Sequence, residues 1–165
     1  MKIAEVLKSG RVRRWHANPD MIDKTPENLA EHQWAVAMIV MFLDPNATAA
    51  TIRYALTHDV GEKDVGDLPS DFKRQNSHIA MRHKQIEDVN RKVRVGNSDA
   101  DADVPLVSMA DSLAAHWFVA CHAPGLARRR DWQDHLNRMR ASKYLTEKVN
   151  ELISHIVEVR DDPHR

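Results

Sequence analysis

Segments with the spacing and boundaries of α-helices account for most of this chain, and the alternation of apolar and polar residues that marks β-strands is almost absent. Within residues 77–95, for example, Ile79, Ile86, Val89 and Val93 recur at intervals that place them on one helical face. The chain shows no internal repeat, low-complexity tract or long linker. Its 165 residues therefore predict a single all-α domain over residues 1–165.

The boundaries of the predicted helices are marked by capping residues and helix breakers. Thr25 followed by Pro26 is a favourable pair for a helix start, and Asp44-Pro45 ends the same helix. The expected helices cover residues 2–9, 25–43, 47–58, 77–95 and 105–121, and one long helix or two with a bend cover 127–160; loops are expected at 11–24 and 60–76 and a turn at 96–103.

Charge and cysteine content argue against several classes of function. Lys and Arg number 24, as do Asp and Glu, so the usual basis for indiscriminate nucleic-acid binding is missing. The single cysteine, Cys121, rules out an internal disulfide and a Cys-rich metal site, which favours a reducing compartment. The longest apolar run, Trp34–Leu43, has ten residues, whereas a membrane span needs roughly 20. We expect a cytoplasmic protein (host cytoplasm for a viral one) that binds neither nucleic acid nor membranes.

Histidine and aspartate residues on three predicted helices form a candidate metal site. His32 lies one turn before the apolar run of its helix, so its imidazole is expected to point inward. The His58-Asp59 dipeptide closes the next helix, and Asp111 lies in an apolar stretch where a lone buried carboxylate would be costly. Two nitrogen and two oxygen donors suit a divalent transition metal with positions left open for water or phosphate.

The spacing alone leaves a structural alternative open. A chain with ten histidines and this aspartate content contains a His-Asp dipeptide about once by chance. In that case His32 and Asp111 are core polar residues satisfied by the backbone or by water, and His58-Asp59 is an ordinary helix terminus. Spacing does not separate the two interpretations.

Short motifs along the chain match a known family in order and spacing. They are Arg13-Arg14-Trp15, Ala30-Glu31-His32, His58-Asp59-Val60-Gly61-Glu62, Gly66-Asp67-Leu68-Pro69 followed by Lys73, and Ala110-Asp111-Ser112-Leu113. They resemble the H…HD…D signature of the HD-domain phosphohydrolases, and more specifically the YfbR-like 5′-deoxynucleotidases and the related DatZ-like dATP triphosphohydrolases of phages. The resemblance covers residues 11–121 and implies an HD-type helical bundle. Residues 16–19 and the C-terminal helices match no family pattern, which leaves the base preference open.

The resemblance also implies a role for each matched residue. His32, His58, Asp59 and Asp111 would hold the metal, which would be Mn²⁺, Co²⁺ or Zn²⁺, with Mg²⁺ also compatible. Glu62 would position the attacking water and take its proton, and Asp67 would lie near the sugar or the scissile phosphate.

Three further residues would bind the substrate. Arg14 and Lys73 would contact phosphate oxygens. Trp15 would face the sugar and base and help to reject a ribose 2′-hydroxyl. The alternative for Trp15 is a purely structural role in which it packs its loop onto the core.

Polar and aromatic residues beyond these motifs receive a structural interpretation. His116, five residues after Asp111, could approach the predicted metal site but is expected to pack or to cap at the surface, and Trp132 is expected to lie in the core or an interface. Arg128–Arg130 is expected to be a solvated face or, in an oligomer, to reach a neighbour's active site. Apolar residues of the C-terminal helices leave room for a homo-oligomer interface, in a dimer or a larger assembly such as a hexamer.

The predicted activity is metal-dependent hydrolysis of a small 2′-deoxynucleotide, with cleavage of the P–O5′ bond at the α-phosphate. The favoured substrate is dATP, which would give deoxyadenosine and triphosphate, because little chain lies beyond the catalytic core. The first alternative is a 5′-deoxynucleotidase that acts on dNMPs. The second is a non-catalytic nucleotide sensor, although a sensor has no need of a water-activating carboxylate such as Glu62.

Overall fold

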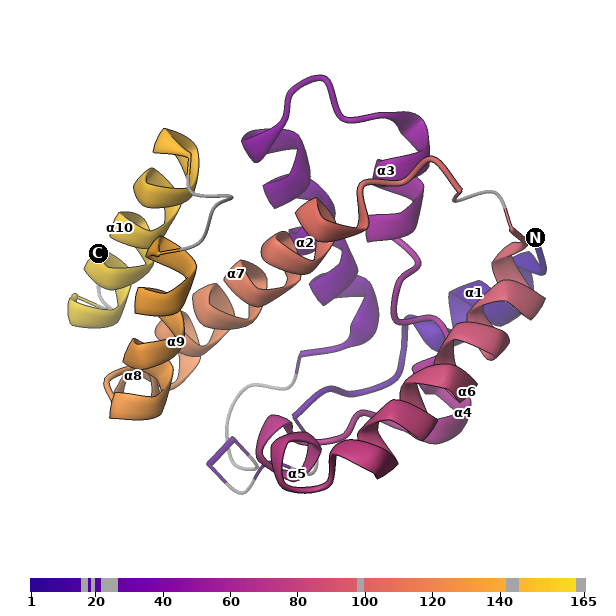
Figure 1. The fold of residues 1–165 in the computed structure, drawn as a ribbon, viewed down its shortest axis with the longest axis horizontal. Helices are drawn as coiled ribbons and strands as arrows, with labels where there is room; N and C mark the ends of the chain where they lie inside the picture. The colour runs from indigo at the N-terminus through magenta and orange to yellow at the C-terminus, as the bar shows by residue number, and fades with distance from the viewer. Residues whose placement is uncertain (16–17, 19, 22–26, 98–99, 142–145, 163–165) are drawn as a thin grey trace.

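The computed structural model is mainly helical over the residues that it describes, which are 1–15, 18, 20–21, 27–97, 100–141 and 146–162 (Figure 1). The helices are α1 (Ile3–Ser9), α2 (Leu29–Leu43), α3 (Ala49–Ala55), α4 (Glu62–Val65), α5 (Ser70–Gln75), α6 (Ser77–Val95), α7 (Val104–His122), α8 (Pro124–Ala127), α9 (Arg130–Arg140) and α10 (Glu147–Asp161). The strand-like pairing in this described part is an isolated antiparallel bridge between Arg13 and Asn28. The predicted all-α class is confirmed.

Helix α7 lies at the centre of the fold, with α2 packed along one side and α10 along another (Figure 1). Towards α2 and α3 it presents small side chains, Ala110 and Ala114, which pack with Val36 and Val40 of α2. Small residues let two helix backbones approach closely and limit relative motion. Asp111 therefore projects from one of the most tightly held helices of the fold.

The same helix is apolar enough and long enough to cross a membrane when only length and composition are considered. In the fold it contacts α2, α3, α8 and α10, and its buried residues belong to clusters shared with these helices. This packing is typical of the core helix of a globular domain, so its hydropathy is weak support for a membrane span.

Helix α2 begins at Leu29, where Asn28 and Glu31 form a reciprocal capping box. The predicted start at Thr25-Pro26 lies outside the described residues. The next helix, α3, is capped by Thr48, whose hydroxyl accepts from Thr51 N–H, and it is shorter than the predicted 47–58. The His58-Asp59 dipeptide consequently lies in the turn after α3 rather than inside the helix.

The predicted loop at 60–76 is partly wrong, because it contains the short helices α4 and α5. Its glycine and proline residues end and begin these helices: Gly66 follows α4 at a φ of 75°, and Pro69 precedes α5. Gly61 has a different function, since a Cβ atom there would lie 2.1 Å from the backbone oxygen of Glu87 on α6. The turn that follows His58-Asp59 thus fits against α6 only with glycine at this position.

Residues 127–160, predicted as one long helix or two with a bend, hold the two helices α9 and α10 in the part that the structure describes, and the short α8 precedes them. Leu136 and Met139 of α9 pack with Ile153 and Ile156 of α10 against α7. This arrangement places the opposite face of α9 next to the cavity described below.

Candidate active site

The four predicted metal ligands meet at one place in the fold. His32 comes from α2, Asp111 from α7, and His58 and Asp59 from the turn after α3. His32 Nε2 lies 2.9 Å from Asp111 Oδ1 and 3.7 Å from Asp59 Oδ2. His58 Nε2 lies 3.2 Å from Asp59 Oδ2 and 3.9 Å from Asp111 Oδ1. The candidate ligand atoms of His32, His58 and Asp59 fall within 4.8 Å of one another, a spacing that one ion can bridge.

Both imidazoles turn Nε2 towards this cluster and Nδ1 towards an acceptor. His58 Nδ1 donates to the carbonyl oxygen of Ala55 at 2.8 Å. His32 Nδ1 lies 3.6 Å from Glu27 Oε1. A proton on Nδ1 leaves the Nε2 lone pair available to a cation. His58 Nε2 is also buried without a hydrogen-bond partner among the described residues, which fits a metal-ligand atom. The donor set of two imidazoles and two carboxylates therefore fits a divalent transition metal.

The carboxylates of the cluster are held in the ionised form. Burial opposes the charge of Asp59, but His58 and Arg14 hold its pKa well below the usual range. Burial also opposes the charge of Asp111, whereas its hydrogen bond to His32 and the charge of His58 lower its pKa. Asp111 is the most open of the four, with a side chain 41% exposed, so it connects the cluster to the space above.

Glu62, the first residue of α4, lies in the same buried region and is 5% exposed. Its Oε2 atom is buried without a hydrogen-bond partner in the described structure. Burial, together with the charges of Asp59 and Asp67, raises its pKa to about 9. A cation at Asp59 would offset these negative charges and favour the ionised form, which is the form that accepts a proton.

Arg14 and Trp15 occupy the strand-like segment opposite Glu27 and Asn28. Arg14 N–H donates to the Glu27 carbonyl at 2.8 Å, and its guanidinium lies 3.6 Å from both Asp59 Oδ2 and Glu27 Oε2. The Trp15 indole donates to Glu27 Oε2 at 2.7 Å. Trp15 also has a φ of 63°, in the left-handed region, which is rare for a bulky residue and occurs at functional sites.

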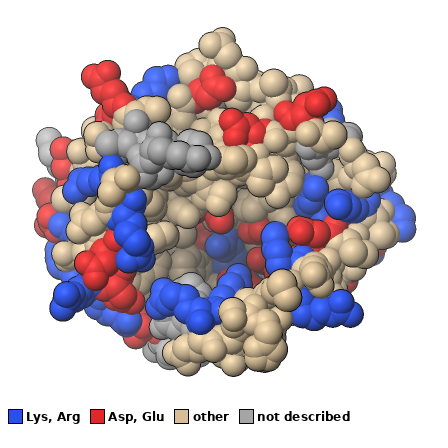
Figure 2. All heavy atoms as spheres, in the orientation of Figure 1, with Lys and Arg blue, Asp and Glu red and all other residues tan. Residues whose placement is uncertain are grey.

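A pocket of about 690 Å³ lies above the cluster, within the size range of small-molecule and cofactor sites. Its lining includes Asp111, Arg14, Trp15, Asp67 and Lys73. Lys73 Nζ lies 3.5 Å from Asp67 Oδ1. Figure 2 shows the face of the molecule with a hollow near its centre, around which Lys and Arg atoms gather beside acidic ones. The predicted phosphate-binding and sugar-binding residues thus share one cavity with a metal-cluster carboxylate.

Trp15 packs its loop onto the core, as the structural alternative expected, and it also lines the pocket. Its ring lies parallel to that of Phe118, with centroids 6.1 Å apart, and next to that of Trp132 at 6.2 Å. The aromatic packing holds in place the face that a sugar or base would contact.

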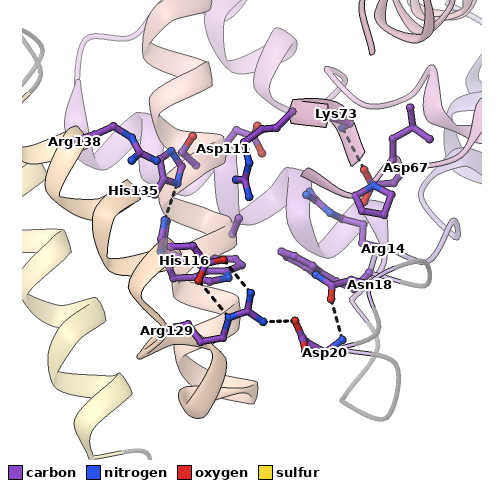
Figure 3. A pocket seen from close by; sticks show the side chains of 18 residues that line it. Arg14, Asn18, Asp20, Asp67, Lys73, Asp111, His116, Arg129, His135 and Arg138 are labelled. Atoms are coloured by element: carbon purple, nitrogen blue, oxygen red, sulfur yellow. Dashed lines mark hydrogen bonds and ion pairs between the residues drawn. The ribbon is translucent and has the colours of Figure 1, made fainter. Parts of the chain in front are cut away.

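The opposite wall of the pocket comes from α7 and α9, and it was not predicted apart from the alternative that His116 approaches the site (Figure 3). His116 is buried rather than at the surface, and its Nε2 lies 2.9 Å from Nδ1 of His135 on α9. Burial and the neighbouring His135 lower the pKa of His116 to about 3. Burial, Arg138 and Arg74 also lower the pKa of His135. The pair is therefore a neutral hydrogen-bonding group at physiological pH.

Arginines of this wall differ in their pairing. Arg129, predicted to be solvated or to reach a neighbouring subunit, lines the pocket of its own chain and pairs with Asp20 and Asp131 (Figure 3). Arg138 has no carboxylate partner among the described residues and, with Arg74, adds positive charge beyond Arg14 and Lys73. The sequence signal for this wall was the i, i+4, i+7 spacing of Asp131, His135 and Arg138, which places them on one face of α9.

Besides the wall formed by α7 and α9, Glu27 was missed in the sequence analysis. It is 3% exposed and contacts Arg14, Trp15 and His32. A glutamate next to a proline in the first turn of a predicted helix gives no sign of burial. The available signal was indirect, since His32, whose imidazole was expected to point inward, needs an anionic or carbonyl partner there.

Comparison with known proteins assigns the family. The HD domain family matches residues 6–95, more than half of the chain, and the chain belongs to this family. The 5′-deoxynucleotidase YfbR of Photorhabdus temperata is 28% identical over an alignment of 130 positions that covers 64% of this chain and 64% of the relative. The YfbR 5′-deoxynucleotidase of Escherichia coli O1:K1 / APEC is 30% identical with the same coverage. The chain thus spans slightly less than two thirds of the length of these relatives.

A solved structure with a similar fold is the HD phosphohydrolase DatZ of cyanophage S-2L, bound to dA and one catalytic Zn²⁺ ion. It superposes with a TM-score of 0.65 at 21% sequence identity, over 98% of this chain and 97% of that one. This similarity establishes the HD-type helical fold for nearly the whole chain and leaves the substrate to be argued from the site.

Proposed function

We propose that this protein is a metal-dependent phosphohydrolase that cleaves the P–O5′ bond of a 2′-deoxynucleotide, with dATP as its preferred substrate and deoxyadenosine and triphosphate as products. The observation that carries the proposal is the cluster of His32, His58, Asp59 and Asp111 beneath a nucleotide-sized pocket lined by Arg14 and Trp15. The names of the relatives, which are 5′-deoxynucleotidases and an HD phosphohydrolase, support the same class of substrate.

A divalent ion held by the four ligands would lower the pKa of water and neutralise charge on the phosphate. The protein's own groups supply the remaining functions. Glu62 takes the proton from the attacking water, because its unpaired Oε2 is buried and its carboxylate lies close enough to Asp59 for the two charges to interact. Arg14, fixed between Asp59 and Glu27, binds a phosphate oxygen with a charge-assisted hydrogen bond. Water oxygen becomes bonded to phosphorus, and O5′ leaves with a proton as the hydroxyl of the deoxynucleoside.

Trp15 and Asp67 would act on the sugar side. The Trp15 ring is held by Phe118 and Trp132, so it cannot move aside for an added 2′-hydroxyl without breaking that packing. Asp67 lines the pocket with Lys73, where it would meet the sugar or the scissile phosphate.

The number of cations in the pocket favours a triphosphate over a monophosphate. Arg14 and Lys73 are sufficient for an α-phosphate, whereas Arg74 and Arg138 supply further charge towards α9. The alternative, a 5′-deoxynucleotidase that acts on dNMPs, is supported by the names of the curated relatives. A non-catalytic nucleotide sensor is the third possibility, and the buried Glu62 argues against it.

A turnover panel tests the proposal. Metal-free protein would be supplied with Mn²⁺, Co²⁺, Zn²⁺ or Mg²⁺ and given each dNTP, each dNMP and the matched ribonucleotides, with products separated by ion-exchange chromatography. Triphosphate released from dATP in preference to other dNTPs supports the proposal. Orthophosphate from dNMPs alone would replace it with the nucleotidase alternative, and binding without turnover would replace it with the sensor.

The predicted homo-oligomer and the cytoplasmic location stay predictions. An apolar face of α2, made of Trp34, Met38, Met41 and Phe42, is exposed in the single chain and would suit an interface. Light scattering at several protein concentrations would measure the mass in solution, and a monomer throughout would contradict the predicted oligomer.

A further inference from the structure

The buried carboxylate of Glu27 lies between three groups with different functions in the proposed site. Its Oε2 atom accepts a hydrogen bond from the Trp15 indole at 2.7 Å and lies 3.6 Å from Arg14 Nε. Its Oε1 atom lies 3.6 Å from His32 Nδ1. The two oxygens therefore face different partners, one on the sugar side of the pocket and the other at the metal cluster.

The backbone fixes Glu27 in this position. Arg14 N–H donates to the Glu27 carbonyl, and Leu29 N–H donates to the Val12 carbonyl, so the two segments run side by side. The capping box of Asn28 and Glu31 then starts α2 immediately afterwards. Glu27 is thus held between the loop that carries Trp15 and the helix that carries His32.

His32 needs such a partner more than His58 does. The Nδ1 atom of His58 is bonded to a main-chain carbonyl of its own turn, which no side-chain substitution removes. The Nδ1 atom of His32 is buried, has no hydrogen-bond partner among the described residues, and faces Glu27 Oε1 slightly beyond hydrogen-bond distance. A carboxylate behind a metal-binding histidine keeps the proton on Nδ1 and raises the basicity of Nε2.

We propose that Glu27 is a positioning residue that couples metal binding to sugar recognition, with Oε1 orienting His32 and Oε2 holding Trp15 and Arg14. The inference rests on the proposed function only where it implies that Glu27 affects hydrolysis of a deoxynucleotide. The coupling itself is a property of the folded protein and of its affinity for a metal ion.

The two-oxygen arrangement gives Glu27→Gln a specific expected result. An amide has one acceptor oxygen, so glutamine can serve the Trp15 N–H or the His32 N–H but not both, and its amino group then faces the other donor. Either Co²⁺ affinity falls about 10- to 100-fold while Trp15 keeps its bond, or Trp15 loses its bond while Co²⁺ affinity stays within about threefold.

Two measurements that need no turnover distinguish these results. Titration calorimetry of metal-free protein with Co²⁺ gives the affinity. The indole N–H resonance of Trp15, assigned by its absence in Trp15→Phe, reports whether its hydrogen bond is intact. If Glu27→Gln loses Co²⁺ affinity, adding Trp15→Phe should restore it at least about fivefold, because the amide oxygen is then released to turn to His32.

Glu31→Gln is the matched control, since Glu31 lies in the same segment but bonds only the start of α2. It should change neither the Co²⁺ affinity nor the Trp15 resonance. The proposal is overturned if Glu27→Gln leaves both readouts unchanged, or if it impairs both together, which would indicate general loosening of the segment. These two readouts use only metal and protein. If the wild-type protein were inactive on every deoxynucleotide, the proposed function would be refuted, but the Co²⁺ affinity and the Trp15 resonance would still test the coupling.

Discussion

The two ends of the pocket are built in different ways. At the metal end, His32, His58, Asp59 and Asp111 are tied to one another and to the backbone over distances of 2.8 to 3.9 Å. At the α9 end, His135 and Arg138 project from a helix that packs on α8 and α10 and meets α7 through the His116–His135 hydrogen bond. We infer that the first end carries the reaction and that the second adjusts which nucleotide enters.

The chemistry should depend on the metal end almost completely. Asp59→Ala removes a proposed metal ligand and the main anionic partner of His58 and Arg14, so we expect hydrolysis to fall at least about 10³-fold and metal content to be lost. The circular-dichroism spectrum of the variant should keep the helical signal of the wild-type protein. Metal analysis measures the metal content and single-turnover assays measure hydrolysis. Asp88→Ala, at an exposed side chain of α6, is the control. Activity that survived in Asp59→Ala would disprove the assignment of the site.

Glu62→Gln should separate metal binding from proton transfer. The glutamine keeps the size of the side chain but accepts no proton, so kcat should fall about 10²- to 10³-fold while metal content is retained. Loss of metal in this variant would instead place Glu62 among the ligands.

The same variant has an expected effect on stability. The pKa of Glu62 is raised from 4.5 to about 9 in the folded, metal-free protein, so the unfolded chain releases this proton at lower pH than the folded one does. Stability is therefore lost as the pH rises from about 4.5 towards 9. At pH 8, the free energy of unfolding of metal-free Glu62→Gln, measured by urea titration, should exceed that of wild type by about 1–3 kcal/mol. This difference in free energy should disappear near pH 4. Equal stability at both pH values would show that Glu62 ionises without penalty.

The metal end was also the part that the sequence predicted, and the reason is physical. Residues such as Asp111 are polar side chains within apolar helical stretches, and they stand out because burying them has a cost. Spacing alone left the structural alternative open, and the four residues were assigned as one site through the resemblance to the HD-domain phosphohydrolases.

The α9 end left no such pattern in the sequence. His135 and Arg138 lie on an amphipathic helix whose polar face is ordinary for a solvated surface, and only the packing of α9 on α10 turns that face into a pocket wall. Glu27 was missed because burial of a loop residue depends on tertiary contacts with segments far along the chain. The short helices α4 and α5 were missed because glycine and proline, which end or begin them, read as loop signals.

A substitution at the α9 end should change substrate preference and leave the chemistry intact. Arg138→Ala removes a cation without a carboxylate partner among the described residues, so kcat/KM for dATP should fall about tenfold while that for dAMP changes less than about threefold. Arg130→Ala, at a side chain 95% exposed, is the control. Equal losses for both nucleotides would assign Arg138 to the α-phosphate, and no loss would remove the α9 wall from phosphate binding.

The smallest expected effect concerns the His116–His135 pair. The pKa of His116 is lowered from 6.5 to about 3, so the unfolded chain takes up a proton below pH 6.5 that the folded protein does not. This residue should therefore cost stability as the pH falls from about 6.5 towards 3. His116→Gln retains a hydrogen-bonding group for His135 but does not titrate, so its stability relative to wild type should improve by about 1–2 kcal/mol between pH 7.5 and pH 5. Urea unfolding of both proteins at the two pH values measures this difference in free energy. The metal ligands titrate in both proteins, so their contribution cancels to a first approximation. If the relative stability did not depend on pH, His116 would have to be protonated in the folded protein, and this wall would present a cation rather than a neutral pair.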